Sequence, residues 1–244
     1  MEIKFKKYLK ALHFAASELV YSPFTIIAVS LLFTLQSFFS QIIAFFPNAL
    51  VVGLLLAILW IFVLTYFYEL LDVGRSWRPR WKKFLSFRTD RFLLFINTYF
   101  IFWIGHLLFK SLLQSAAHSS PEFVFYLNLI ILLVFNSLPE TIVEKEIGGL
   151  EAFSESASIF FNRTFSWLLP VLLVQTLPVL LLTGFNLSSL SAIVFSDPLL
   201  PGAVYFQFVD VNNLITWLPS ILIASILAIF LANFRFELYR TSFK

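Results

Sequence analysis

Histidine and cysteine are the first residues to examine for chemistry, and this sequence offers little of either. His13, His106 and His118 are not spaced as metal ligands on a helix. Cysteine is absent, which excludes disulfides, thiolate metal sites and a cysteine nucleophile. Neither a Gly-x-Ser-x-Gly elbow nor a phosphate-binding glycine loop occurs. We therefore predict no catalytic residue, no metal site and no cofactor, and hence no enzymatic activity.

A polar group within an apolar stretch is the next candidate. His106, Lys110 and Gln114 are four residues apart and so share one face of a helix. One hypothesis is that they line a small polar cavity, because polar residues inside a membrane face protein or water. The alternative, which we favour, is that Lys110 extends its ammonium group to the membrane interface.

The segment 69–91 combines cations with aromatic residues. We predict that it binds anionic lipid or a partner through the side chains of Arg75, Arg78, Arg80, Trp81, Lys82 and Lys83. A basic residue near an anionic membrane surface contributes about 1 kcal/mol of attraction, and tryptophan prefers the interface. The alternative is that these charges only set the topology.

The segment 140–164 is amphipathic and acidic. Helical spacing places Glu144, Glu151 and Glu155 on one polar stripe, and the glycine pair 148–149 should interrupt the helix. Like charges four residues apart repel, so a cation should lie nearby. We predict that this segment docks on segment 69–91 as a cytoplasmic cap. The alternative is that both segments are solvated amphipathic faces.

The composition indicates the class of fold that positions these residues. Of 244 residues, 59% are hydrophobic and 13% charged, and phenylalanine occurs 32 times. An ordinary soluble domain is near half apolar and about a quarter charged, so this chain could not bury its apolar surface in water. We predict an all-α integral membrane protein forming one polytopic domain over residues 1–244.

The apolar stretches predict about six transmembrane helices, since each span needs roughly 20 residues. They lie at 22–46, 49–68, 92–114, 122–139, 165–185 and 213–234. Pro47 and Asn48 predict a tight turn between the first two spans, and Pro170 and Pro178 predict kinks in the fifth.

The distribution of Lys and Arg predicts the topology. Four precede the first span, seven lie in 69–91, two in 140–164 and three at the end. Because cytoplasmic loops carry the excess of basic residues, both termini and both charged segments should be cytoplasmic. Residues 186–212 should then form an outer loop, and residues 1–20 an interfacial amphipathic helix on an anionic leaflet.

A family resemblance adds to this prediction. A span ending at Pro139 is followed by Glu144, the 148–149 glycines, Ala152, Ser156 and Asn162, and the chain closes on the sequence FRFELYR at 234–240. This pattern resembles YciC-like bacterial membrane proteins and the membrane domain of glycerophosphodiester phosphodiesterases. The resemblance implies a six-helix bundle in the bacterial inner membrane and brings no catalytic residues.

The sequence therefore favours a non-catalytic membrane protein, acting as an accessory or scaffold subunit. Its expected partners are the lipid bilayer, with anionic lipids, and other integral membrane subunits; nucleic acid is not expected. A small-solute or lipid transporter is the alternative function. An intramembrane enzyme is the least favoured, because paired acids within the spans are lacking.

Overall fold

Helices make up all the regular structure in the part of the chain that is described. The computed structural model describes residues 2–73, 87–115, 121–183, 190–194, 197, 199–209 and 214–243. The α-helices are α1 (Glu2–Tyr21), α2 (Pro23–Ala44), α3 (Ala49–Val73), α5 (Thr89–Ser115), α6 (Pro121–Val134), α7 (Leu138–Lys145), α8 (Gly149–Leu182), α9 (Leu190–Val194) and α10 (Leu214–Phe243), and η2 (Pro201–Phe208) is a 3-10 helix. The prediction of an all-α fold is thus confirmed for these residues.

Five helical segments are long and apolar enough to cross a membrane. They are Pro23–Ala44, Ala49–Asp72, Phe125–Lys145, Gly149–Leu182 and Thr216–Thr241. The remaining predicted span, 92–114, forms α5, and most side chains of α5 beyond Gly105 lie outside the described set. The protein is therefore a helical membrane protein with five identified candidate spans.

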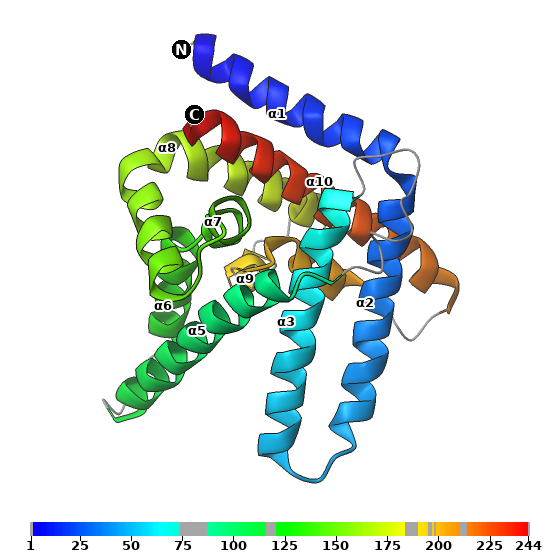
Figure 1. The fold of residues 1–244 in the computed structure, drawn as a ribbon, viewed down its shortest axis with the longest axis vertical. Helices are drawn as coiled ribbons and strands as arrows, with labels where there is room; N and C mark the ends of the chain where they lie inside the picture. The colour runs from blue at the N-terminus through cyan, green and yellow to red at the C-terminus, as the bar shows by residue number, and fades with distance from the viewer. Residues whose placement is uncertain are drawn as a thin grey trace.

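The turn between α2 and α3 confirms the prediction made from Pro47 and Asn48. Asn48 Oδ1 accepts hydrogen bonds from the backbone N–H groups of Leu50 (3.0 Å) and Val51 (3.3 Å), and so caps α3. The two helices run side by side to a hairpin tip at the end of the bundle opposite to the chain termini (Figure 1).

The chain between α7 and α8 is shaped by the glycine pair. Helix α7 ends at Lys145, Glu146 takes a left-handed conformation (φ 54°), and α8 begins at Gly149 with φ 63°. The predicted interruption is confirmed. A Cβ atom at Gly148 would lie 3.0 Å from the carbonyl oxygen of Leu94, so glycine at this position favours the close approach of α5.

Thr98 of α5 caps α8 from the neighbouring helix. The N–H of Gly149 donates to Thr98 Oγ1 at 2.9 Å in a buried position. We expect Thr98→Val to lower the free energy of unfolding by about 1–2 kcal/mol, because a buried donor then loses its acceptor. Thr98→Ser keeps the hydroxyl and should change stability much less. Detergent unfolding titrations of both variants would test this, and equal losses would contradict the capping role.

Helix α8 also contains a break that the sequence analysis did not predict. Arg163 departs from helical angles (φ −140°, ψ 26°), ahead of the predicted kinks at Pro170 and Pro178. The hydroxyl of Ser166 donates to the carbonyl of Arg163 at 3.2 Å, and hydroxyls that bond to a preceding turn bend helices. Figure 1 shows α8 turning near the C-terminus of α10.

Helix α1 lies against α10 at the end of the bundle where both termini are found (Figure 1). Ala11 and Ala15 are fully buried there, whereas Phe5 and Leu9 remain exposed. Part of the apolar surface of α1 therefore packs on α10, and another part is exposed. Lys7 donates to the carbonyl of Thr241, and Lys10 pairs with Glu237 at 3.1 Å.

The predicted outer loop, 186–212, contains part of the core. Leu199, Leu200, Val204 and Tyr205 are buried, and η2 packs on α10. Gly202 makes the closest approach, since a Cβ atom there would lie 2.9 Å from the Cβ of Ala228. This segment thus belongs to the packed bundle and not only to its surface.

Candidate functional site

Helices α3 and α5 form a V whose closed end is fixed by ionic and aromatic contacts. Arg91 on α5 lies 2.9 Å from Asp72 Oδ2 and 3.3 Å from Glu69 Oε1, both on α3. The rings of Tyr68 and Phe95 stack beside this pair with centroids 5.5 Å apart. From there the two helices diverge toward their far ends (Figure 1).

The open part of the V is a groove with a volume of about 510 Å³, which we call the α3–α5 groove. Its lining residues are Ala49, Leu50, Gly53, Leu54, Ala57, Ile58, Ile61, Ile96, Tyr99, Phe100 and Trp103. The volume falls within the range of about 300–1,000 Å³ that is typical of ligand pockets. One wall of the groove belongs to α3, a helix that is long and apolar enough to cross a membrane.

Small residues give the α3 wall of the groove its space. Ala49, Gly53 and Ala57 are four residues apart and therefore lie on one helical face. A Cβ atom added at Gly53 would have no atom within 4 Å. The wall is thus open at Gly53 because the sequence places no side chain there.

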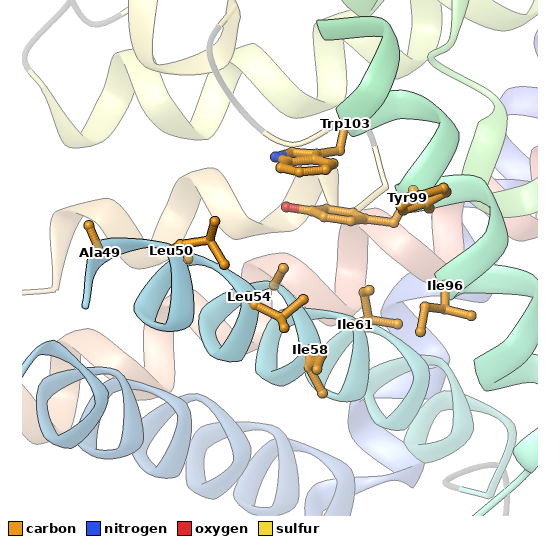
Figure 2. Close-up of a pocket in the computed structure, with 11 residues that line it drawn as sticks. Ala49, Leu50, Leu54, Ile58, Ile61, Ile96, Tyr99 and Trp103 are labelled. Carbon is orange, nitrogen blue, oxygen red and sulfur yellow. The ribbon is translucent and has the colours of Figure 1, made fainter. Parts of the chain in front are cut away.

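Tyr99 and Trp103 provide the only polar side-chain atoms of this lining set. Figure 2 shows both rings extending from α5 over the residues of α3. Tyrosine and tryptophan combine a large apolar ring with one hydrogen-bonding atom. The groove can therefore hold an apolar chain along its walls and make few polar contacts with it.

A neighbouring face of α3 is held by the segment after α9. Trp60 Nε1 donates to Asp197 Oδ2 at 2.5 Å, and the N–H of Leu199 donates to Asp197 Oδ1 at 2.8 Å. Tyr68 donates its hydroxyl hydrogen to the carbonyl of Leu199 at 2.7 Å. These bonds fix α3 on one side, so the groove wall is supported.

Relatives of known function would refine this interpretation. The comparisons with family models, curated proteins and solved structures found no match.

Several predicted site residues cannot be placed. Arg75, Arg78, Arg80, Trp81, Lys82 and Lys83 lie outside the described residues. His106, Lys110 and Gln114 lie on α5, but their side chains are outside the described set. Both predictions stay as predictions.

The acidic residues of the predicted stripe in segment 140–164 are described, and they pair with one distant and one nearby cation. Glu144 accepts two hydrogen bonds from Arg240 of α10, at 2.6 and 3.0 Å. Glu155 pairs with Lys145 at 2.5 Å, so the cation expected near this stripe comes from the same segment. Glu151 is exposed.

One contact joins the two charged segments. Arg88 lies 3.0 Å from Glu146 and 2.5 Å from Asp90. The hydrogen bonds that Arg88 donates to Asp90 and Glu146 raise the pKa of Arg88, and the bond to Asp90 holds the pKa of that carboxyl below its usual range. These side chains are largely exposed, so the contact orients the segments more than it stabilises them.

A buried ionic centre was missed by the sequence analysis. Arg235 Nε lies 2.5 Å from Glu140 Oε1 and Nη2 lies 2.8 Å from Oε2; Nη2 also donates to the carbonyl of Asn136. The side chains of Arg235 and Glu140 are 1% and 2% exposed. We call Asn136, Glu140, Trp167 and Arg235 the Arg235 centre. The sequence carried a weak signal of this pair. Glu140 and Arg235 have opposite charges, and each directly follows a predicted span.

Among the described residues, no group of three His, Asp or Glu side chains could hold a metal ion. The α3–α5 groove is apolar, and the ionised side chains of the Arg235 centre are engaged with one another. The described geometry thus offers an apolar binding surface.

Proposed function

We propose that this chain is a non-catalytic multi-pass membrane protein that binds membrane lipid, with one acyl chain in the α3–α5 groove. The groove itself carries the proposal: it has aliphatic walls and two amphipathic rings. Its walls belong to a helix that is apolar enough to span a membrane, so the medium that meets the groove is hydrocarbon.

The lining of the groove suits a lipid chain. Its walls are aliphatic, and Tyr99 and Trp103 alone of the lining residues carry a hydrogen-bonding side-chain atom. A single acyl chain could enter between α3 and α5, and a partner helix is the other occupant that the labelling experiment distinguishes.

The proposed membrane arrangement has six spans, with α5 as the sixth. Both termini and the basic segment 69–91 then face the bacterial cytoplasm, where the basic residues meet anionic head groups. The termini lie at the same end of the bundle, as this topology requires (Figure 1). In this arrangement the protein serves as an accessory or scaffold subunit that holds lipid among its membrane partners.

Photochemical labelling tests the groove directly. The protein is placed in nanodiscs that contain a phosphatidylcholine with a diazirine on one acyl chain, and labelled residues are located by mass spectrometry. We expect labelling at Tyr99 and Trp103 to exceed that on other lipid-facing helices. Gly53→Leu should reduce it several-fold, because the new side chain fills open space in the groove.

Gly105→Leu is the matched control. A Cβ atom at Gly105 also meets nothing within 4 Å, but Gly105 does not line the groove. The control should leave the labelling of Tyr99 and Trp103 unchanged. If labelling is uniform over the lipid-facing helices, or if both variants act alike, the lipid is merely annular and the proposal fails. Crosslinks from Trp103 to another protein in native membranes would instead assign the groove to a partner helix.

A further inference from the structure

The Arg235 centre contains polar atoms that the chain does not satisfy. Asn136 Nδ2 and Oδ1, Trp167 Nε1 and Arg235 Nη1 are buried and have no hydrogen-bond partner among the described residues. The three residues are each about 1% exposed. Buried polar groups in folded proteins are nearly always paired with protein or ordered water, so this group of atoms indicates a ligand.

These atoms surround one guanidinium group. Arg235 Cζ lies 5.8 Å from the centroid of the Trp167 ring, and Arg235 Nη2 donates to the carbonyl of Asn136. Asn136 belongs to the break between α6 and α7, Trp167 to α8 and Arg235 to α10. The unsatisfied atoms thus come from three elements that meet at Arg235.

The charge and the donor pattern define the ligand. Arg235 is already paired with Glu140 through two hydrogen bonds, so the centre has no net charge and does not favour an ion. Arg235 Nη1, Trp167 Nε1 and Asn136 Nδ2 are donors, and Asn136 Oδ1 is an acceptor. The ligand should be small, neutral and rich in lone pairs.

We propose that the Arg235 centre binds internal water within the membrane-spanning bundle. Water matches the four unsatisfied atoms because it can both donate and accept, and internal water typically makes about three hydrogen bonds to buried polar groups. The site is separate from the α3–α5 groove and does not depend on the proposed lipid binding. Its role is to solvate an ion pair that lies between two candidate spans, Phe125–Lys145 and Thr216–Thr241.

Further polar side chains lie between the Arg235 centre and the C-terminal end of α10. Thr141 directly follows Glu140, and its Oγ1 lies 3.5 Å from the hydroxyl of Tyr239, one helical turn beyond Arg235. The pair of Glu144 with Arg240 comes next and is partly exposed.

Nuclear magnetic resonance of the indole groups tests the site. The full chain, with ¹⁵N-labelled tryptophan, is studied in nanodiscs of phosphatidylcholine and phosphatidylglycerol, and the Trp167 signal is assigned with Trp167→Phe. We expect a magnetisation-transfer peak from water to the Trp167 Nε1 hydrogen. The Trp60 indole is the control, because its N–H is bonded to Asp197 at 2.5 Å and should show a peak several-fold weaker.

Asn136→Leu provides the second measurement, since it removes two of the polar atoms. It should reduce the Trp167 water peak several-fold and leave the Trp60 signal unchanged. The absence of a water peak at Trp167 in the unmodified protein would overturn the proposal, even if the variant did not fold. A peak of unchanged intensity in a folded Asn136→Leu variant would overturn it as well.

Discussion

Replacing Arg235 by methionine is expected to lower the free energy of unfolding by about 3–5 kcal/mol. The guanidinium holds Glu140 by two hydrogen bonds, and both side chains are nearly inaccessible. Removal of the arginine leaves a buried carboxylate without a counter-charge, which costs more than the pair itself contributes. Unfolding of the purified protein in mixed detergent micelles, followed by circular dichroism, would measure the change.

Two further variants distinguish this mechanism from a loss of packing. The double variant Glu140→Leu/Arg235→Met should recover most of the lost stability, because an apolar pair of similar volume leaves no buried charge. Arg240→Met removes a pair whose side chains are 27% and 19% exposed, and it should cost about 1 kcal/mol or less. If the double variant were as unstable as Arg235→Met, the carboxylate would not be the cause.

The spans could be predicted because hydrophobic length is a local property of the sequence. The runs at 22–46 and 49–68 became α2 and α3, and Asn48 caps the turn between them. The fourth run, 122–139, is less regular, since α6 ends at Val134 and α7 begins at Leu138. Pro139 near the start of α7 allows a new helix to begin there.

The ionic contacts were harder to predict because their partners are far apart in the chain. Glu140 and Arg235 are separated by 95 residues, and their pairing depends on α7 lying against α10. Helical spacing alone predicted one stripe for Glu144, Glu151 and Glu155, but Glu144 lies on α7 and the other two lie on α8. The pairing of Glu144 with Arg240 depends on the packing of α10, which local spacing does not encode.

The α3–α5 groove is a tertiary feature that no single segment encodes. Its small residues, Ala49, Gly53 and Ala57, were visible in the sequence at a spacing of four. That spacing would also suit close packing against another helix. The open space arises because α5 diverges from α3 beyond the contact of Arg91 with Glu69 and Asp72.

The outer segment shows how packing can override an apparent loop. Residues 186–212 were predicted to form an outer loop, yet Pro201 begins η2 and Gly202 lies against α10. The missing side chain of Gly202 allows this close contact. Its replacement should therefore reveal whether η2 is structural.

Gly202→Ala is expected to lower the free energy of unfolding by about 1–3 kcal/mol, the usual cost of overpacking. The added methyl group would lie 2.9 Å from Ala228 Cβ and 3.0 Å from Ala228 Cα, so the η2 or α10 backbone must move. The loss can be measured by the same detergent titration. Gly53→Ala is the control: its added Cβ has no atom within 4 Å, and alanine is favoured over glycine inside a helix, so this variant should not lower the free energy of unfolding.

A second substitution at the contact identifies its cause. Ala228→Gly alone should destabilise α10 by about 1 kcal/mol, because glycine is unfavourable inside a helix. In the presence of Gly202→Ala it removes the methyl group that clashes, so the double variant should be more stable than the sum of the two single effects predicts. Strictly additive effects would mean that η2 does not press on α10 at this point. A coupling of about 1 kcal/mol would instead show that the outer segment is part of the bundle's core.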